Sequence, residues 1–209
     1  MVSFFDDLAF LRSREAVIFP GHHSQLERMM TEIILLPGIN GSGPMHWQSL
    51  WEAANPQMRR FSPSDWDAPI LSDWILALDR AVAATRSPPV LVAHSLACLL
   101  VAHWLKASPL PVAGAFLVAV PDPTGAKFPR EAASFAAPPE DRFRCPSLIL
   151  ASSDDPYGSL EHARRRAAQW GSSSIEIGPL GHVNDRSGLG DWPTGAALLA
   201  AFCSGLSTP

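Results

Sequence analysis

Three kinds of side chain in this sequence, an alcohol, a carboxylate and an imidazole, stand where they could together cleave an acyl bond. Ser95 stands one residue after the apolar run 90–93. Asp154 and Asp155 follow a later apolar run, and His182 comes after the last one. A neutral imidazole can take the proton of a serine hydroxyl, and a carboxylate can hold that imidazole in place. The chain order therefore predicts nucleophilic attack by Ser95 on an acyl carbonyl, with His182 as base and one of the two aspartates as its partner.

Ser95 is expected on a sharp turn between a strand and a helix, the setting of a nucleophile elbow. The flanking positions that must be small are Ala93 and Ala97, where glycine is usual. Each alanine adds one methyl group, which leaves the turn within reach. An ordinary serine at a helix N-terminus would look similar, so the elbow depends on the other two groups. The neighbouring His94 and Cys98 are interpreted as structural.

A glycine-rich loop at residues 37–43 follows the first buried run, 33–36, and can present backbone N–H groups to a ligand. It has neither the glycine spacing of a dinucleotide site nor the lysine of a phosphate-binding loop. An oxyanion-hole loop is therefore favoured over a phosphate cradle. The expected oxyanion donors are the backbone N–H of Leu96 and that of either Ile39 or Asn40.

Two groups of side chains could shape a substrate pocket beside the serine. Trp47, Trp66 and Trp192 could form an apolar wall, which would favour a short acyl or aromatic ester, or they could be core residues. Lys127 and Arg130 stand in a proline- and alanine-rich connection that could roof the pocket. There they could meet a carboxylate on the substrate.

The elements that position these residues alternate along the chain between apolar runs and amphipathic stretches. This alternation predicts the α/β class, with an α/β-hydrolase-like core in which a mostly parallel sheet of about six strands has helices on both faces and no large lid. We expect strands near 33–36, 58–61, 90–93, 112–120, 147–151 and 174–177. We expect helices near 45–54, 71–84 (capped by Ser72 or a nearby polar residue), 96–106, 159–170 and 194–202, and a weak one near 130–135.

The composition argues against several classes of function. Hydrophobic residues make up 47% of the 209 residues, enough for a sizeable core. The net charge is -4 without a basic block, so nucleic-acid binding is not expected. No apolar run approaches the roughly 18 residues of a membrane span, and no metal-ligand spacing is present, so neither membrane, metal nor cofactor is predicted. The widely spaced Cys98, Cys145 and Cys203 indicate reduced thiols and a cytoplasmic location.

Residues 1–29 differ from the rest of the chain. They have no charged start followed by a long apolar core, so they do not form a secretory signal. We expect an extension without fixed structure, an added helix, or a translation start upstream of the true one. The organised domain is expected at residues 30–209.

From about Thr31 onward the chain resembles the small serine hydrolases related to retinoblastoma-binding protein nine, particularly their bacterial members. The resemblance implies a lidless α/β-hydrolase core and a Ser–His–Asp triad, with the aspartate before the proline, Asp155, as the triad member. The sequence departs from the family's pattern at the two elbow alanines, and it lacks an L-x-C-x-E motif, so binding to a retinoblastoma-type protein is not implied. The matching segments are Leu36-Pro37-Gly38, His46-Trp47-Gln48, 93–97, 152–156, Gly181-His182 and 190–193.

The residues and the resemblance together predict a serine hydrolase that cleaves a small acyl ester through an acyl-enzyme. A thioesterase or acyltransferase would use the same three groups, and a non-catalytic binding module could keep the same fold. The expected partner is a small-molecule acyl substrate.

Overall fold

The computed structural model describes residues 31–206, so the expected extension at 1–29 lies outside the described residues. Within this range six strands form one parallel sheet, with neighbours in the order β2-β1-β3-β4-β5-β6. The predicted α/β-hydrolase core is confirmed. The strands are β1 (Ile33–Leu36), β2 (Met58–Arg60), β3 (Val90–His94), β4 (Gly114–Val118), β5 (Ser147–Ala151) and β6 (Ser173–Glu176).

The inner strands are buried on both faces because helices cover the sheet from two sides. Every residue of β1, β3, β4 and β5 is buried, whereas the edge strand β6 is exposed throughout. Continuous apolar runs are the pattern that such doubly covered strands require. Successive side chains alternate between faces, so Leu91 packs into one core cluster and Val92 into the other.

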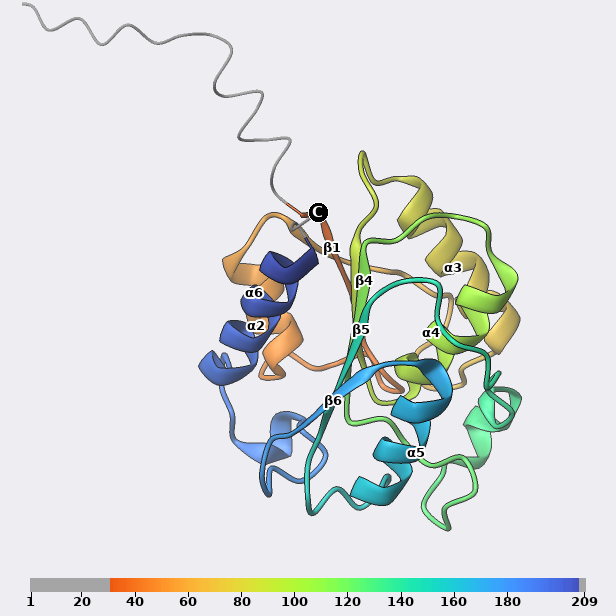
Figure 1. The fold of residues 1–209 in the computed structure, drawn as a ribbon, viewed down its shortest axis with the longest axis vertical. Helices are drawn as coiled ribbons and strands as arrows, with labels where there is room; N and C mark the ends of the chain where they lie inside the picture. The colour runs from red at the N-terminus through yellow and green to blue at the C-terminus, as the bar shows by residue number, and fades with distance from the viewer. Residues whose placement is uncertain (1–30, 207–209) are drawn as a thin grey trace, which may run out of the picture. The chain divides into compact units, whose positions relative to one another are not determined.

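Two helices cover one face of the sheet and three cover the other (Figure 1). The pair is α2 (Trp47–Ala54) and α6 (Pro193–Leu206). The three are α3 (Leu71–Ala83), α4 (Leu96–Ala107) and α5 (Leu160–Trp170). The loops that follow the carboxyl ends of the strands meet at one edge of the sheet, where open parallel sheets bind ligands.

Some local expectations were wrong. Ile70, not Ser72, occupies the N-cap of α3, and it makes no side-chain cap bond. The run of three arginines 164–166 in α5 predicts a solvated face, but Arg166 is only 8% exposed, and its guanidinium lies 5.7 Å from the ring centroid of Trp170. Helix α6 continues to Leu206 rather than ending at Phe202.

The connection between β4 and β5, residues 119–146, contains a single short 3₁₀ helix, η1 (Arg130–Phe135), and no larger lid. Two side chains of η1, Ala132 and Phe135, are fully buried in the core. Phe135 meets Trp74 of α3 with ring centroids 5.3 Å apart. This contact fixes the connection against the body of the domain, so the segment that stands beside the site is short and anchored.

Candidate active site

Ser95 stands on a strained turn between β3 and α4. Its backbone has φ 55° and ψ -125°, a conformation that non-glycine residues seldom adopt and that is concentrated at functional sites. The flanking Ala93 and Ala97 are completely buried, so the added methyl groups fit. Gly38 approaches so closely that a Cβ built on it would lie 3.0 Å from the Cβ of Ser95 and 3.1 Å from the carbonyl oxygen of His94.

Ser95, His182 and Asp155 form a continuous hydrogen-bonded row. The Oγ of Ser95 lies 2.7 Å from Nε2 of His182. The other ring nitrogen, Nδ1, lies 2.9 and 3.0 Å from the two carboxylate oxygens of Asp155. The Asp155 side chain is 1% exposed and that of His182 10%. In this geometry the imidazole can take the serine proton while the buried carboxylate stabilises the cation that forms.

The two adjacent aspartates, which sequence spacing could not separate, do different things. Asp155 faces His182 and also accepts the N–H of Tyr157 at 2.9 Å. Asp154 instead accepts the hydroxyl of Ser152 at 2.8 Å and the N–H of Gly181 at 2.7 Å. The Ser152 bond, followed by the Gly181 bond, lowers the pKa of Asp154 below its ordinary value. Asp154 therefore stabilises the segment that carries His182 by binding the residue before it, Gly181.

The loop that carries His182, residues 180–187, is held by side-chain hydrogen bonds from Ser152 outside it and Ser187 within it. Ser152 accepts the N–H of Leu180 at 2.9 Å, and Ser187 donates to the carbonyl oxygen of Leu180 at 2.6 Å. Ser187 also accepts the N–H of Asn184 at 3.2 Å. These bonds replace the backbone ladder that a helix or strand would supply.

Two further contacts press this loop onto the sheet. The Nε2 of His94 lies 2.9 Å from the carbonyl oxygen of His182, and the indole N–H of Trp47 donates to the carbonyl oxygen of Val183 at 2.8 Å. Val183 is fully buried at φ 50°, an outlying conformation for a β-branched residue. The surrounding contacts must hold this strain, as expected at a functional site.

Two residues that line the cavity together with Ser95, namely Ile39 and Leu96, have backbone N–H groups that are unengaged within the described residues. In the described part of the chain, the N–H groups of Leu96 and Ile39 donate to no protein acceptor. Leu96 is the first residue of α4, where such orphan N–H groups are expected. The N–H of Asn40 donates to the carbonyl oxygen of Trp66 at 2.9 Å, so of the two alternatives Ile39 is the one whose N–H is free of a protein acceptor in residues 31–206.

The expected tryptophan wall is also wrong. Trp47 and Trp192 are 1% and 3% exposed and pack together in the core, with centroids 5.2 Å apart. Trp66 packs against Phe61 and Trp74 at 5.2 and 5.5 Å. None of the three lines the cavity beside the serine. Their contribution is indirect, since they support the loops around the site.

The cavity beside Ser95 and His182 has a volume of about 580 Å³. Its lining includes Phe128 and Tyr157, which the sequence did not single out, and His46, which was noted only as part of a family motif. The ring centroids of Tyr157 and His182 lie 4.5 Å apart. Tyr157 is the single tyrosine of the chain and stands two residues after Asp155, and this position was the available signal.

Burial disfavours the charged forms of the other two imidazoles and of the thiol near Ser95. Burial lowers the pKa of His46 to about 4 and holds that of His94 well below its ordinary value. Burial also raises the pKa of the Cys98 thiol, so this side chain is no rival nucleophile. In residues 31–206 no cluster of three metal-binding side chains is present, and none of the helices is long and apolar enough to cross a membrane.

The family model described as serine hydrolase matches residues 33–201. The chain belongs to the serine hydrolase family. This serine hydrolase is similar to a YdeN-like hydrolase of Pectobacterium atrosepticum, at 30% identity and TM-score 0.77, covering 88% of this chain and 97% of that one. The ydeN gene product of B. subtilis is 19% identical, with TM-score 0.69, and the match covers 84% and 100% of the two chains.

More distant structures share the fold alone. A monoacylglycerol lipase of Paleococcus ferrophilus is 14% identical with TM-score 0.63, and the match covers 85% of this chain and 95% of that one. A search of curated proteins found no match. The family match and the hydrolase neighbours identify the protein as a hydrolase built on the α/β-hydrolase fold.

Proposed function

We propose that this serine hydrolase cleaves small carboxylic esters through an acyl-enzyme on Ser95. The observation that carries the proposal is the 2.7 Å contact between the hydroxyl of Ser95 and Nε2 of His182, with Asp155 on the other nitrogen. A serine hydroxyl is a weak nucleophile until an adjacent base removes its proton. No other serine of the described chain has this combination of a strained turn, an imidazole partner and a cavity.

The reaction proceeds in two halves. His182 takes the proton of Ser95 as the oxygen attacks the acyl carbon, and it then gives that proton to the departing alcohol. Water enters, loses its proton to His182, and attacks the acyl-enzyme, so that Ser95 leaves with the proton and the carboxylic acid is released. Asp155 keeps Nδ1 protonated, which leaves Nε2 as the acceptor in both halves.

The negative oxygen formed in each half needs donors that are already in position. The N–H groups of Leu96 and Ile39 supply them, since neither has a partner in the described residues. One such donor lowers the barrier by about 3–4 kcal/mol. Gly38 lets the Ile39 segment approach the elbow because it carries no side chain.

The size of the site favours small substrates. The cavity holds about 580 Å³, which suits a compact acyl group and alcohol. The motifs shared with the relatives of retinoblastoma-binding protein nine support placing the chain near that group within the family. The cysteine count supports a cytoplasmic location.

The test is covalent labelling by a fluorophosphonate, followed by turnover on esters of graded chain length. We expect labelling of the wild type, none of Ser95→Ala, and a loss of turnover in that variant on the order of 10⁶-fold. A folded wild-type protein that resists the label would indicate a binding module instead. Faster transfer to an added alcohol or thiol than to water would indicate an acyltransferase, and a preference for thioesters a thioesterase.

A further inference from the structure

The cavity beside Ser95 has more carboxylates than cations in its wall. Asp67, Glu131 and Asp185 line it, against the single guanidinium of Arg186. The three acids come from three separate segments: the loop before α3, the helix η1, and the short 3₁₀ helix η2 (Asp185–Ser187). Within residues 31–206 none of the three acids forms an ion pair. The excess negative charge is therefore available to a ligand.

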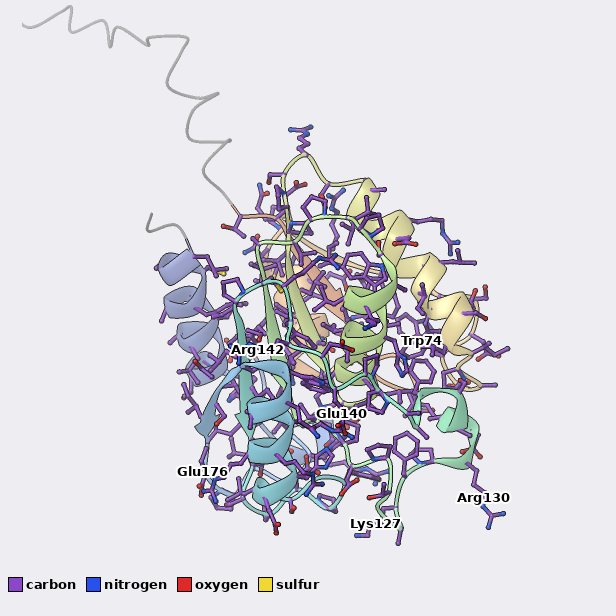
Figure 2. The ribbon with its side chains drawn as sticks, turned by 45° about the vertical axis from the view of Figure 1, so that its right-hand side comes forward. Trp74, Lys127, Arg130, Glu140, Arg142 and Glu176 are labelled. Carbon is purple, nitrogen blue, oxygen red and sulfur yellow. The ribbon has the colours of Figure 1, made fainter. Side chains whose placement is uncertain are left out.

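The cations expected to roof the site lie elsewhere. Figure 2 shows Arg130 extending away from the body of the domain, and Lys127 at the outer tip of its loop. Neither lines the cavity, whereas the next residue, Glu131, does. A third cation, Arg60 of β2, does not line the cavity either. Its guanidinium is held by the carboxylate of Glu52 at 3.0 Å and by the carbonyl oxygen of Gly41 at 2.6 Å. The expectation that Lys127 and Arg130 meet a substrate carboxylate is thus not met. The charged residue that this connection places beside the cavity is the acidic Glu131.

A buried donor in the same wall indicates a missing ligand group. His46 is 3% exposed, and its Nδ1 accepts the N–H of Gln48 at 3.2 Å, so its proton sits on Nε2. In the described chain this Nε2 has no hydrogen-bond partner. A buried donor without an acceptor costs about 1–3 kcal/mol. An oxygen on a molecule in the cavity could satisfy it after a small shift of the ring.

Aromatic faces complete a wall suited to a positive charge. Phe128 and Tyr157 both line the cavity. A cation over such a ring gains about 0.5–2 kcal/mol, more as water is excluded. Carboxylates around a cleft also raise the local concentration of cations and repel anions.

We propose that the site selects esters that carry a positive charge, such as an amine or quaternary ammonium group, and disfavours anionic esters. The proposal rests on the proposed function, because it names the substrate class of that same site. The carboxylates of Asp67, Glu131 and Asp185 attract the cation, and the Nε2–H of His46 donates to an oxygen of the bound ester.

The experiment compares esters of equal shape and different charge. One series, with the charge on the alcohol, is choline acetate, its neutral carbon analogue dimethylbutyl acetate, and sulfoethyl acetate. The other, with the charge on the acyl chain, is the nitrophenyl esters of trimethylammoniobutyrate, dimethylhexanoate and glutarate. In at least one series kcat/KM should be about 3–10-fold higher for the cation than for the neutral ester, and this ratio should fall with added salt. A neutral or anionic ester in first place in both series would overturn the proposal.

Substitutions of the acidic residues in the cavity wall test whether they cause the preference for cationic esters. Glu131→Gln and Asp67→Asn should each lower the cation-to-neutral ratio of kcat/KM by about 2–3-fold. Glu161→Gln removes the same charge from an exposed position on α5 outside the cavity, and Arg130→Gln changes the neighbour of Glu131 that points away. These two controls should leave the ratio unchanged. Equal ratios in all four variants would show that the wall does not set the preference.

A binding measurement separates this proposal from the catalytic one. Ser95→Ala should bind choline acetate more tightly than dimethylbutyl acetate in an NMR titration, whether or not the wild type turns either over. Failure of fluorophosphonate labelling with this binding preference intact would reject the catalytic role alone. Successful labelling with equal binding of the two esters would reject the charge preference alone.

Discussion

Ser95 and His182, the proposed nucleophile and base, are held in place in two different ways. Ser95 is held by the main chain, through a strained turn between a buried strand and a buried helix, with Ala93 and Ala97 packed on either side. His182 lies in a loop without regular structure beyond one short 3₁₀ turn, held by side chains such as Asp154 from distant segments. The elbow depends on the sizes of its neighbours, and the histidine loop depends on hydrogen bonds. Substitutions far from His182 in sequence should therefore alter activity.

Among the variants that test how the two residues are held, the largest difference in activity is expected between substitutions of Asp155 and of Asp154. Asp155→Asn should lower kcat by about 10⁴-fold, because an amide no longer holds the ring of His182 in the required tautomer. Asp154→Asn keeps an oxygen for Ser152 and Gly181, and its loss should stay below about tenfold. Steady-state ester turnover measures both. Similar losses in the two variants would contradict the division of roles.

Acidic pH should lower the free energy of unfolding, because it favours protonation of histidines that are buried in the folded protein. Burial lowers the pKa of His46 from 6.5 to about 4, so below pH 6.5 the unfolded chain binds a proton that the folded one does not. Lowering the pH from about 6.5 to 4 should therefore remove about 3 kcal/mol from the free energy of unfolding through this group. His94, His103 and His162, whose pKa values burial also lowers, act in the same direction.

Urea unfolding at several pH values measures this effect. His46→Gln carries no titrating group at that position, so its free energy of unfolding should depend less steeply on pH than that of the wild type. Parallel curves for the two proteins across this range would count against a buried neutral imidazole at His46. Below pH 3.8 a separate loss follows as Asp154, whose pKa is lowered in the folded state, becomes protonated.

Crowding the elbow gives the next effect. In Gly38→Ala the new Cβ would lie 3.0 Å from the Cβ of Ser95, so the oxyanion loop or the elbow must shift. Such overpacking costs about 1–3 kcal/mol and should lower kcat more than it raises KM, because the Ile39 donor moves. Gly43→Ala, in the same loop with no atom within 4 Å of the new Cβ, should leave the free energy of unfolding unchanged. Equal stability of the two variants would show that the elbow tolerates crowding.

The smallest effect tests one bond of the histidine loop. Ser187→Ala removes the donor to the carbonyl oxygen of Leu180 and the acceptor for Asn184, which should cost about 1 kcal/mol of stability and a few-fold in kcat. Ser153→Ala removes an exposed hydroxyl that makes no side-chain hydrogen bond in the described structure. Denaturant unfolding and ester turnover of the two should differ. If they match, the loop does not depend on Ser187.

The fold was predictable because its signals are local. Buried parallel strands read as continuous apolar runs, and the runs around 33–36, 90–93 and 147–151 coincide with β1, β3 and β5. The edge strand β6 was placed one residue too late. The end of α6 was placed too early, because helix ends depend on fraying and packing rather than on periodicity.

Chain order alone put Ser95 and His182 forward as partners, since the loops after parallel strands must meet at one edge of a sheet. Residue spacing could not separate Asp154 from Asp155 or Ile39 from Asn40. In the tertiary structure Asp155 contacts His182 while Asp154 contacts Gly181, and the N–H of Asn40 is bonded to Trp66, because neighbouring loop residues can point to opposite sides.

Tertiary structure also moved the tryptophans into the core and placed Glu131 rather than Arg130 beside the cavity. Apolar periodicity predicts only that a side chain will be buried, and a charged residue in a loop is predicted only to be exposed to water. Which cavity a side chain shares, and with which partners, is settled when segments remote in sequence pack together. The sequence by itself therefore predicted the fold and put Ser95 forward as the nucleophile, while packing determined which side chains surround Ser95 and what charge they carry.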